Sequence, residues 1–256
     1  MIRLSIIILT LNQDQKLKNC LGSVVKDIGH RQDFEVIVID NNTQKDISQV
    51  IRGYLSRIIY IKNPENKGVA PARNQGIRIA RGDYLMFIDD DAEVVDGCFQ
   101  KIIDFMDKTP DCWCLGTKQI KPDGSLEYNA RTFYTLPVIL ARRTFLGIFM
   151  KKWTKMHLMH DWDHKTTRKV DWVAGASFVM RREAVNMIGS LDESYFFGFE
   201  DVDWCHRVKL AGKSVYYLHD ATVIHHVQGS SRKLFSRQAL NHFLSAIRYF
   251  CKFNMY

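Results

Sequence analysis

Uninterrupted apolar segments alternate with amphipathic segments over the first ninety residues. The apolar segments predict strands, and the amphipathic segments between them predict helices. Continuous apolar strands separated by helices are typical of a parallel sheet that helices cover on both faces. The predicted strands are Arg3–Thr10, Phe34–Asp40, Ile58–Lys62 and Tyr84–Asp89, and the predicted helices are Asp14–Lys26, Asp46–Leu55 and Val69–Ile79.

The second half of the chain is organised differently, with shorter predicted strands and two segments rich in basic and aromatic residues. A Pro-Asp-Gly turn separates its first two strands. The predicted strands are Cys112–Ile120, Leu126–Phe133, Asp171–Met180 and the end of a strand in Thr222–Ser231, and the predicted helices are Arg182–Ile188 and a segment from Glu200 to a stop at Gly212.

Two basic, apolar segments each admit two interpretations. Leu136–His160 is rich in aromatic and basic residues and contains no acid, so it predicts either an amphipathic segment on an anionic membrane or lipid-like acceptor, or a helical flap over the core. Arg232–Tyr256 carries apolar residues at helical spacing. It predicts a helix that lies on a membrane surface or packs back on the domain.

Composition narrows the class of protein. A chain of 256 residues with 46% hydrophobic residues is long and apolar enough to bury a full core, which excludes a disordered tail protein. The net charge of +8 suggests an anionic partner, but Lys and Arg are spread along the chain and no nucleic-acid module is present. Six cysteines without CxxC spacing are interpreted as reduced thiols of a cytoplasmic protein, and the apolar N-terminal stretch as a buried strand.

Polar residues cluster where the first, second and fourth predicted strands end. In open α/β sheets, ligands bind beyond the carboxyl ends of the strands. Asp89, Asp90 and Asp91 are consecutive at the end of the fourth predicted strand, and three adjacent like charges repel one another. A divalent cation that bridges carboxylates to phosphate oxygens would offset this repulsion. The alternative is that the acids cap a helix beginning at Glu93.

A second acidic pair follows an aromatic loop. Glu200 and Asp201 open a predicted helix directly after Tyr195, Phe196, Phe197 and Phe199. Aromatic rings that shield a carboxylate from water raise its pKa, which suits a general base. Further along, His225 and His226 are adjacent on a predicted strand, so one of them must point away from the other.

The order of these motifs resembles the family 2 glycosyltransferases, inverting enzymes that use nucleotide-sugar donors and have the GT-A fold. The resemblance covers residues 3 to about 233, and its last three motifs are most similar to the rhamnosyltransferase branch. The motifs are IILTLN, VIVIDNNT, NKGVAPARNQGI, GDYLMFIDDDAEV, WVAGASFVMRREAV, LDESYFFGFEDVDWCHRV and HHVQGSS. TLN stands where TYN is more usual in the family, which puts the stacking of the donor base in doubt.

The resemblance implies a role for each matching residue. Asp89 and Asp91 match the DxD motif that holds Mg²⁺ or Mn²⁺ on the donor diphosphate, and His226, in HVQGSS, matches a residue that approaches this metal. Asp201 matches the catalytic base, with Glu200 beside it. The implied donor-binding residues are Thr10, Asn12, Asp40, Arg73, Asn74, Asp89 and Asp90, and those on the acceptor side are Trp172, Gly175 and Phe199.

The resemblance also implies the fold and activity. We expect an α/β fold of the GT-A type, with a Rossmann-like, mostly parallel sheet flanked by helices and a smaller acceptor-side region. Residues 1–110 would bind a dTDP- or UDP-sugar, residues 111–233 would bind a saccharide or lipid-linked acceptor, and residues 234–256 would form an amphipathic helix. The expected location is the cytoplasm, with the inner face of the membrane as an alternative. The alternative functions are a metal-dependent phosphohydrolase or nucleotidyltransferase, and a non-catalytic module that binds anionic ligands.

Overall fold

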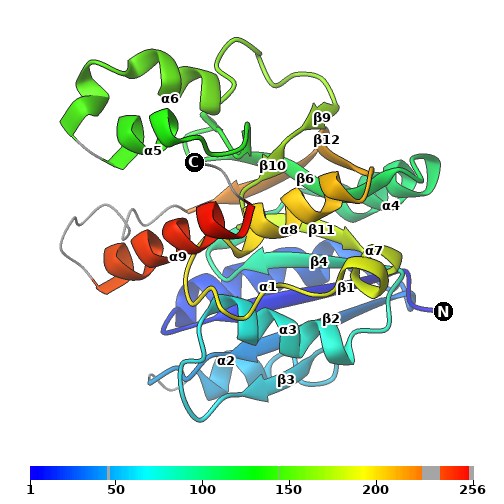
Figure 1. The fold of residues 1–256 in the computed structure, drawn as a ribbon. Helices are drawn as coiled ribbons and strands as arrows, with labels where there is room; N and C mark the ends of the chain where they lie inside the picture. The colour runs from blue at the N-terminus through cyan, green and yellow to red at the C-terminus, as the bar shows by residue number, and fades with distance from the viewer. Residues whose placement is uncertain (45–46, 144, 227–236, 254–256) are drawn as a thin grey trace.

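The computed structural model describes residues 1–256 except 45–46, 144, 227–236 and 254–256. Helices cover a central mixed sheet (Figure 1). The strands are β1 (Leu4–Thr10), β2 (Phe34–Asp40), β3 (Ile59–Lys62), β4 (Tyr84–Asp89), β5 (Ala92–Val94), β6 (Cys112–Ile120), β7 (Leu126–Glu127), β8 (Ala130–Arg131), β9 (Arg168–Val170), β10 (Trp172–Val173), β11 (Ser177–Arg181) and β12 (Ser214–His225). The helices are α1 (Asp14–Ile28), α2 (Ser48–Arg52), α3 (Val69–Ile79), α4 (Cys98–Lys108), α5 (Leu136–Arg143), the 3-10 helix η1 (Phe145–Ile148), α6 (Lys151–His157), α7 (Arg182–Ile188), α8 (Glu200–Leu210) and α9 (Arg237–Phe253).

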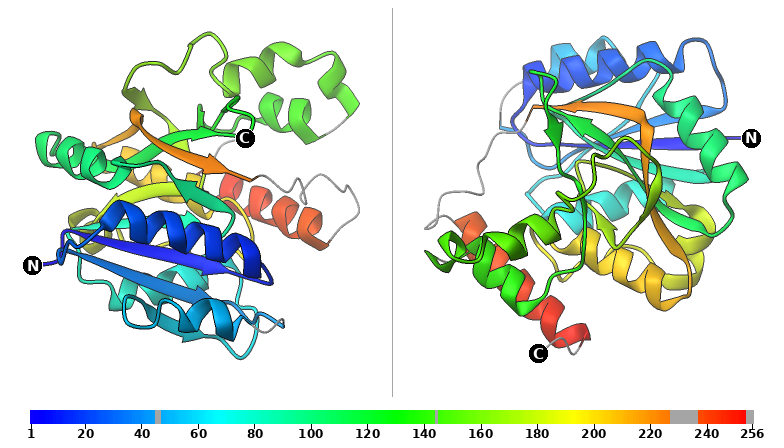
Figure 2. Two further views of the ribbon diagram at one scale, coloured as in Figure 1. Left: turned by 180° about the vertical axis from the view of Figure 1, so that it is seen from behind. Right: turned by 90° about the horizontal axis from the view of Figure 1, so that it is seen from above.

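The sheet has the strand order β3-β2-β1-β4-β11-β6-β12-β5. The first four of these strands are parallel, as the sequence predicted, whereas β11 runs antiparallel to both β4 and β6. Successive residues of β1 point to opposite faces, so Ile6 and Ile8 pack toward α1 and α4 while Ile7 packs toward α3. The helices therefore bury both faces of the sheet (Figure 2), and the predicted α/β class is confirmed.

Three predicted elements are shorter or divided in the structure. The helix expected over Asp46–Leu55 is shorter, because α2 spans Ser48–Arg52, and residue 46 is outside the described part of the chain. Leu126–Phe133 divides into β7, which pairs with β6, and β8, which pairs with β10 in a separate sheet. Asp171–Met180 divides into β10 and β11, because the chain must leave one sheet for the other near Gly175.

The residues after the three aspartates form a strand. Ala92–Val94 is β5, which pairs antiparallel with the end of β12. The interpretation that Asp89–Asp91 cap a helix beginning at Glu93 is therefore wrong. The pairing also matters for the site, because it sets Ala92 opposite His225 and so brings a histidine beside Asp91.

Where they are described, the two basic segments fold as helices that pack on the domain. Tyr249 of α9 is fully buried, and its hydroxyl lies 2.9 Å from His206 Nδ1. Val138 of α5 is likewise buried. Each segment also presents apolar side chains to solvent, notably Phe149, which is 83% exposed, and Phe243 of α9. Packing on the domain is thus established for both segments, and their outer faces remain available for contact.

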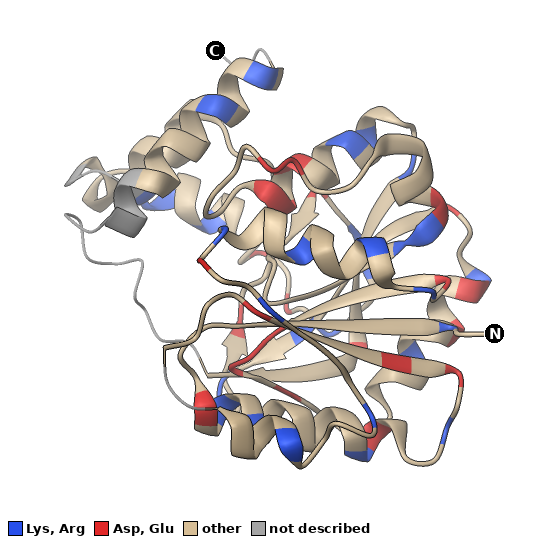
Figure 3. Ribbon diagram, turned by 90° about the horizontal axis from the view of Figure 1, so that it is seen from below, with Lys and Arg blue, Asp and Glu red and all other residues tan. Residues whose placement is uncertain are grey.

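Within the described ranges, no helix combines the length and apolarity needed to cross a bilayer. Lys and Arg positions are scattered over helices and loops and interspersed with acids in the view of Figure 3. The division of the chain at residues 110 and 233 stays a prediction, since the ten-stranded sheet takes strands from both sides of residue 110.

Candidate active site

The three consecutive aspartates have different environments. The Asp90 side chain is directed into the protein, where its Oδ2 accepts hydrogen bonds from Thr10 Oγ1 at 2.6 Å and from the Leu11 backbone N–H at 3.2 Å. Burial raises the pKa of Asp90 to about 7, although the Thr10 hydrogen bond acts in the opposite direction. Asp90 thereby joins the ends of β1 and β4, and Asp89 and Asp91 are left to face the site.

Arg73 supplies the buried positive charge that the acids require. Only 3% of this residue is exposed. Its Nη2 donates to Asp89 Oδ1 at 2.8 Å and to the Gly175 carbonyl at 2.7 Å, and its Nη1 lies 3.3 Å from Glu200 Oε1. The guanidinium of α3 therefore connects the first acidic cluster to the second.

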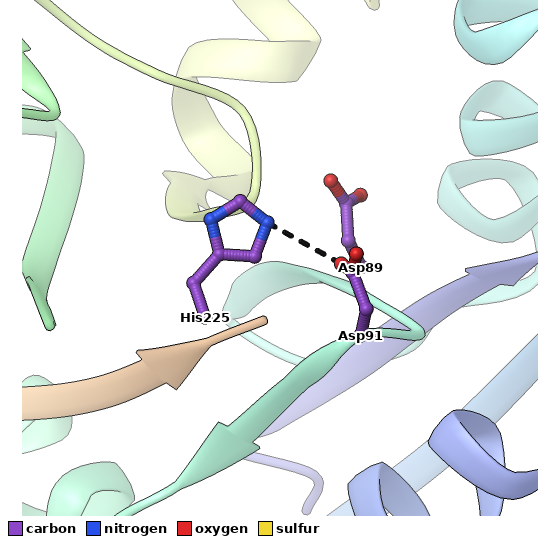
Figure 4. A group of neighbouring side chains, drawn as sticks. All are labelled: Asp89, Asp91 and His225. Atoms are coloured by element: carbon purple, nitrogen blue, oxygen red, sulfur yellow. Dashed lines mark ion pairs between the residues drawn. The ribbon is translucent and has the colours of Figure 1, made fainter. Parts of the chain in front are cut away.

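Asp89, Asp91 and His225 form the candidate metal centre. One ligand atom from each lies within 4.8 Å of the others (Figure 4). His225 Nε2 is 3.3 Å from Asp91 Oδ1, and Nδ1 is 2.7 Å from Glu127 Oε2. Burial disfavours a charged imidazole, but these two carboxylates outweigh it and raise the pKa of His225 to about 10. Two carboxylates and an imidazole suit Mn²⁺, and the carboxylates also suit Mg²⁺, so the donor set fits the expected ion.

The histidine beside the aspartates is not the one chosen from the sequence. His226 Nε2 lies 2.8 Å from Glu93 Oε1, and His226 is absent from the candidate metal group of the described residues. The reason is the alternation of side chains along β12: the pairing of His225 with Ala92 directs His225 into the site and His226 to the other face. His225 therefore replaces His226 in the candidate metal set.

The acidic pair Glu200 and Asp201 opens α8 across Arg73 from the metal centre. Asp201 Oδ2 accepts from the Gly175 N–H at 2.9 Å, and its Oδ1 accepts from the Val202 N–H at 2.8 Å. Burial raises the pKa of Asp201, and burial together with the charge of Asp201 raises the pKa of Glu200 to about 7. Two adjacent carboxyl groups with raised pKa values are suited to proton transfer near neutral pH.

Close packing explains the glycine at position 175. A Cβ atom there would lie 2.9 Å from Arg73 Nη1 and 3.2 Å from Asp201 Oδ2. Any side chain would therefore displace the guanidinium or the carboxylate. The loop before α8 is also constrained, because Phe199 has φ +74°, a left-handed conformation that is rare for an aromatic residue and typical of functional sites.

Two of the expected donor-binding residues, Asp40 and Asn12, lie close together in the structure. Asp40 is fully buried, and its two oxygens accept from the Thr43 N–H and the Tyr60 hydroxyl, each at 2.7 Å. Asn12 lies beside this group, since its N–H donates to Thr43 Oγ1 at 3.1 Å. Asp40 and Asn12 are therefore neighbours at the ends of β1 and β2, and Tyr60 was not identified from the sequence.

Three other expected site residues have mainly supporting contacts. Asn74 is 1% exposed and exchanges hydrogen bonds with the backbone of Leu191, which fastens α3 to the loop before α8. The Trp172 and Phe199 rings are buried against Tyr134. These contacts place both aromatic side chains in the hydrophobic core, and their expected place on the acceptor side stays a prediction.

The α/β sheet, with carboxylates clustered beyond the carboxyl ends of its parallel strands, has the architecture expected of a GT-A fold. The family model for glycosyl transferase family 2 matches residues 5–186, so the chain belongs to this family. The chain is 27% identical over 256 residues to rhamnosyltransferase WbbL of Escherichia coli K12, covering 96% of this chain and 92% of WbbL. It is 22% identical over 231 residues to dTDP-rhamnosyl transferase RfbF of Shigella flexneri, covering 89% and 70% of the two chains.

Solved structures support the same fold. GalNAc-T7, crystallised with UDP, GalNAc and Mn²⁺, superimposes with a TM-score of 0.71 at 18% identity, covering 98% of this chain and 48% of GalNAc-T7. The expected GT-A fold is therefore confirmed. The roles of individual site residues stay predictions.

Proposed function

We propose that the protein is an inverting, metal-dependent rhamnosyltransferase of cell-surface polysaccharide synthesis. The donor is dTDP-rhamnose, and the acceptor is a saccharide or a lipid-linked saccharide. The observation that carries the proposal is the placement of a metal-type cluster, Asp89, Asp91 and His225, across Arg73 from the buried carboxyl pair Glu200 and Asp201. Relatives named as rhamnosyltransferases support the sugar, and one named as a dTDP-rhamnosyl transferase supports the nucleotide.

Different residues of the chain have different roles in a single nucleophilic displacement at the anomeric carbon of the donor sugar. Asp89, Asp91 and His225 hold the ion, which when bound would neutralise the charge developing on the leaving nucleoside diphosphate. Asp201 accepts the proton of the acceptor hydroxyl as that oxygen attacks the anomeric carbon from the face opposite the diphosphate. The configuration inverts because only one displacement occurs and no enzyme nucleophile takes part. The sugar passes through an oxocarbenium-like state, which the nearby carboxylate also stabilises.

A metal-dependent phosphohydrolase or nucleotidyltransferase would share the acidic cluster. It would not need a second carboxyl pair aligned across an arginine from the metal centre. The two functions also differ in product, because a glycosyltransferase releases nucleoside diphosphate whereas these alternatives release phosphate or pyrophosphate.

Nucleotide binding provides the experiment for the donor. We expect the thermal unfolding temperature to rise with dTDP and Mn²⁺ together and to rise much less with dTDP alone, because a ligand that binds only the folded state stabilises it. UDP, GDP and CDP serve as the comparison set, and Asp91→Asn, which removes one metal-site charge, is the matched variant. If UDP were the one nucleotide that raised the unfolding temperature, the donor would be a UDP-sugar instead. If no nucleotide raised it, the proposal would be contradicted.

We also propose that the enzyme works at the inner face of the cell membrane. Phe149 and Ile148 are 83% and 70% exposed, and the exposed lysines Lys151, Lys152 and Lys155 follow directly. This apolar and basic surface, with no acid between residues 136 and 160, matches an anionic bilayer. Helix α9 lies on the same side of the molecule as α5 and α6 (Figures 1 and 2), and its exposed apolar residues are Phe243, Leu244 and Ile247.

Sedimentation with liposomes tests this contact. We expect wild-type protein to sediment with phosphatidylglycerol vesicles, and Phe149→Ser to weaken this binding about 10- to 150-fold, since a buried aromatic ring contributes roughly 1.5–3 kcal/mol. Met187→Ser on α7 is the control, because Met187 is also largely exposed but lies outside this surface. Equal sedimentation of the wild type and Phe149→Ser would reject the membrane contact.

A further inference from the structure

The β6–β7 hairpin places Glu127 beside His225, on the side of the imidazole that faces away from Asp89 and Asp91 (Figure 4). Glu127 of β7 pairs with Gln119 of β6, and Val223 of β12 pairs with the same Gln119 from the other side. The three strands therefore run side by side where His225 ends β12. Glu127 and His225 are 98 residues apart in sequence, yet the carboxylate and the imidazole are in contact near the end of β6.

The contact fixes the direction of the imidazole. Glu127 Oε2 lies 2.7 Å from Nδ1 of His225, and the opposite ring nitrogen, Nε2, lies 3.3 Å from Asp91 Oδ1. Figure 4 shows one ring nitrogen of His225 directed at the aspartates and the other directed away from them. Both partners are largely withdrawn from solvent, with 14% of the His225 side chain and 21% of the Glu127 side chain exposed. A ring held in this way at Nδ1 presents Nε2 to the space between Asp89 and Asp91.

Histidines that bind metals commonly donate their second N–H to a carboxylate, which fixes the tautomer and makes the ligating nitrogen more basic. We infer that Glu127 is a positioning residue that holds His225 for the metal ion of the proposed transferase. The inference rests on the proposed function in one respect only, namely that Asp89, Asp91 and His225 bind a divalent ion.

The neighbouring pair Glu93 and His226 offers a matched comparison. It is also a carboxylate in contact with a histidine, at 2.8 Å, and it lies beside the same strand end. Its histidine does not belong to the candidate metal group of the described residues. Removal of either glutamate deletes one negative charge near the ion. A difference in Mn²⁺ affinity between the two variants would therefore come from the orientation of His225 and not from the change in charge.

The test is the affinity for Mn²⁺, measured by electron paramagnetic resonance of the free ion with and without dTDP. We expect Glu127→Ala to weaken Mn²⁺ binding about 10- to 100-fold, the usual effect of losing a carboxylate behind a metal-bound histidine. Glu127→Gln should recover part of the loss, because its amide oxygen still accepts a hydrogen bond from Nδ1. Glu93→Ala should bind Mn²⁺ within about twofold of the wild type, because the histidine that Glu93 contacts does not belong to the candidate metal group of the described residues.

The outcomes separate this inference from the proposed function. Glu127→Ala with wild-type affinity, in a protein where Asp91→Ala loses Mn²⁺, would overturn the role of Glu127 and leave the metal site intact. Equal losses in Glu127→Ala and Glu93→Ala would also overturn it, because charge alone would then explain both. Wild-type affinity in Asp91→Ala would remove the proposed metal site and the inference together. Thermal unfolding of each variant without metal checks that the fold is retained.

Discussion

Asp201→Asn is expected to lower the rate of sugar transfer by at least about a thousandfold, within the range of general-base catalysis, while nucleotide affinity stays within about twofold of the wild type. The amide has the shape of the carboxylate and can still accept from the Gly175 N–H, which lies 2.9 Å from Asp201 Oδ2. It cannot accept the proton of an acceptor hydroxyl. Asp201 also lies across Arg73 from the metal cluster, so its replacement should not disturb donor binding.

The measurement for Asp201→Asn combines nucleoside diphosphate release from the donor with titration of the nucleotide. In the wild type we expect the rate to fall as the pH is lowered, with a midpoint above the ordinary aspartate pKa of 3.8, because burial raises the pKa of Asp201 and only the deprotonated form acts as a base. The residual activity of the variant should lack this dependence. A variant whose main defect is weaker nucleotide binding would contradict the assignment.

Arg73→Met is expected to destabilise the protein by about 3–5 kcal/mol, the usual consequence of removing one partner of a buried ion pair. Its side chain is 4% exposed, and without it the buried Glu200 and the neighbouring Asp89 lose their shared cation. Methionine retains much of the apolar volume, so the lost charge should dominate the change. Transfer should fall as well, since Arg73 also fixes the Gly175 carbonyl beside the proposed catalytic residues Glu200 and Asp201.

Urea unfolding provides this measurement, and Arg78→Met on the same helix provides its control. Arg78 pairs with Glu193 at 3.4 Å, but both side chains are at least half exposed. Exposed ion pairs contribute about 0–1 kcal/mol, so Arg78→Met should be close to the wild type. Similar losses in the two variants would show that Arg73 has no special part in neutralising the buried acids.

Local patterns in the sequence were sufficient for the strand–helix alternation of the first half. The apolar runs that end at Thr10, Asp40 and Asp89 coincide with β1, β2 and β4, because each strand is buried on both faces and is followed by polar residues. Most of the acidic residues of the candidate site could then be predicted from the polar positions at the ends of these strands.

The remainder depended on contacts between distant segments. Strand alternation showed that only one of His225 and His226 can face the site, but the choice is made by pairing with β5, whose strand character was not recognised. Glu127 reaches His225 through a hairpin register that no local pattern specifies. Trp172 matches a residue of a family motif, yet its ring is buried because β10 pairs with β8 in a second small sheet.

The central claim is that this site transfers a sugar from a nucleotide donor with the help of a divalent ion. The most direct test is product analysis after incubation of the wild type with dTDP-rhamnose, Mn²⁺ and a lipid-linked saccharide acceptor, with Asp201→Asn in parallel. We predict metal-dependent release of dTDP together with a glycosylated acceptor of inverted anomeric configuration, and formation of both products at least about a thousandfold slower by the variant. Release of phosphate or pyrophosphate, or a product with retained configuration, would contradict this account.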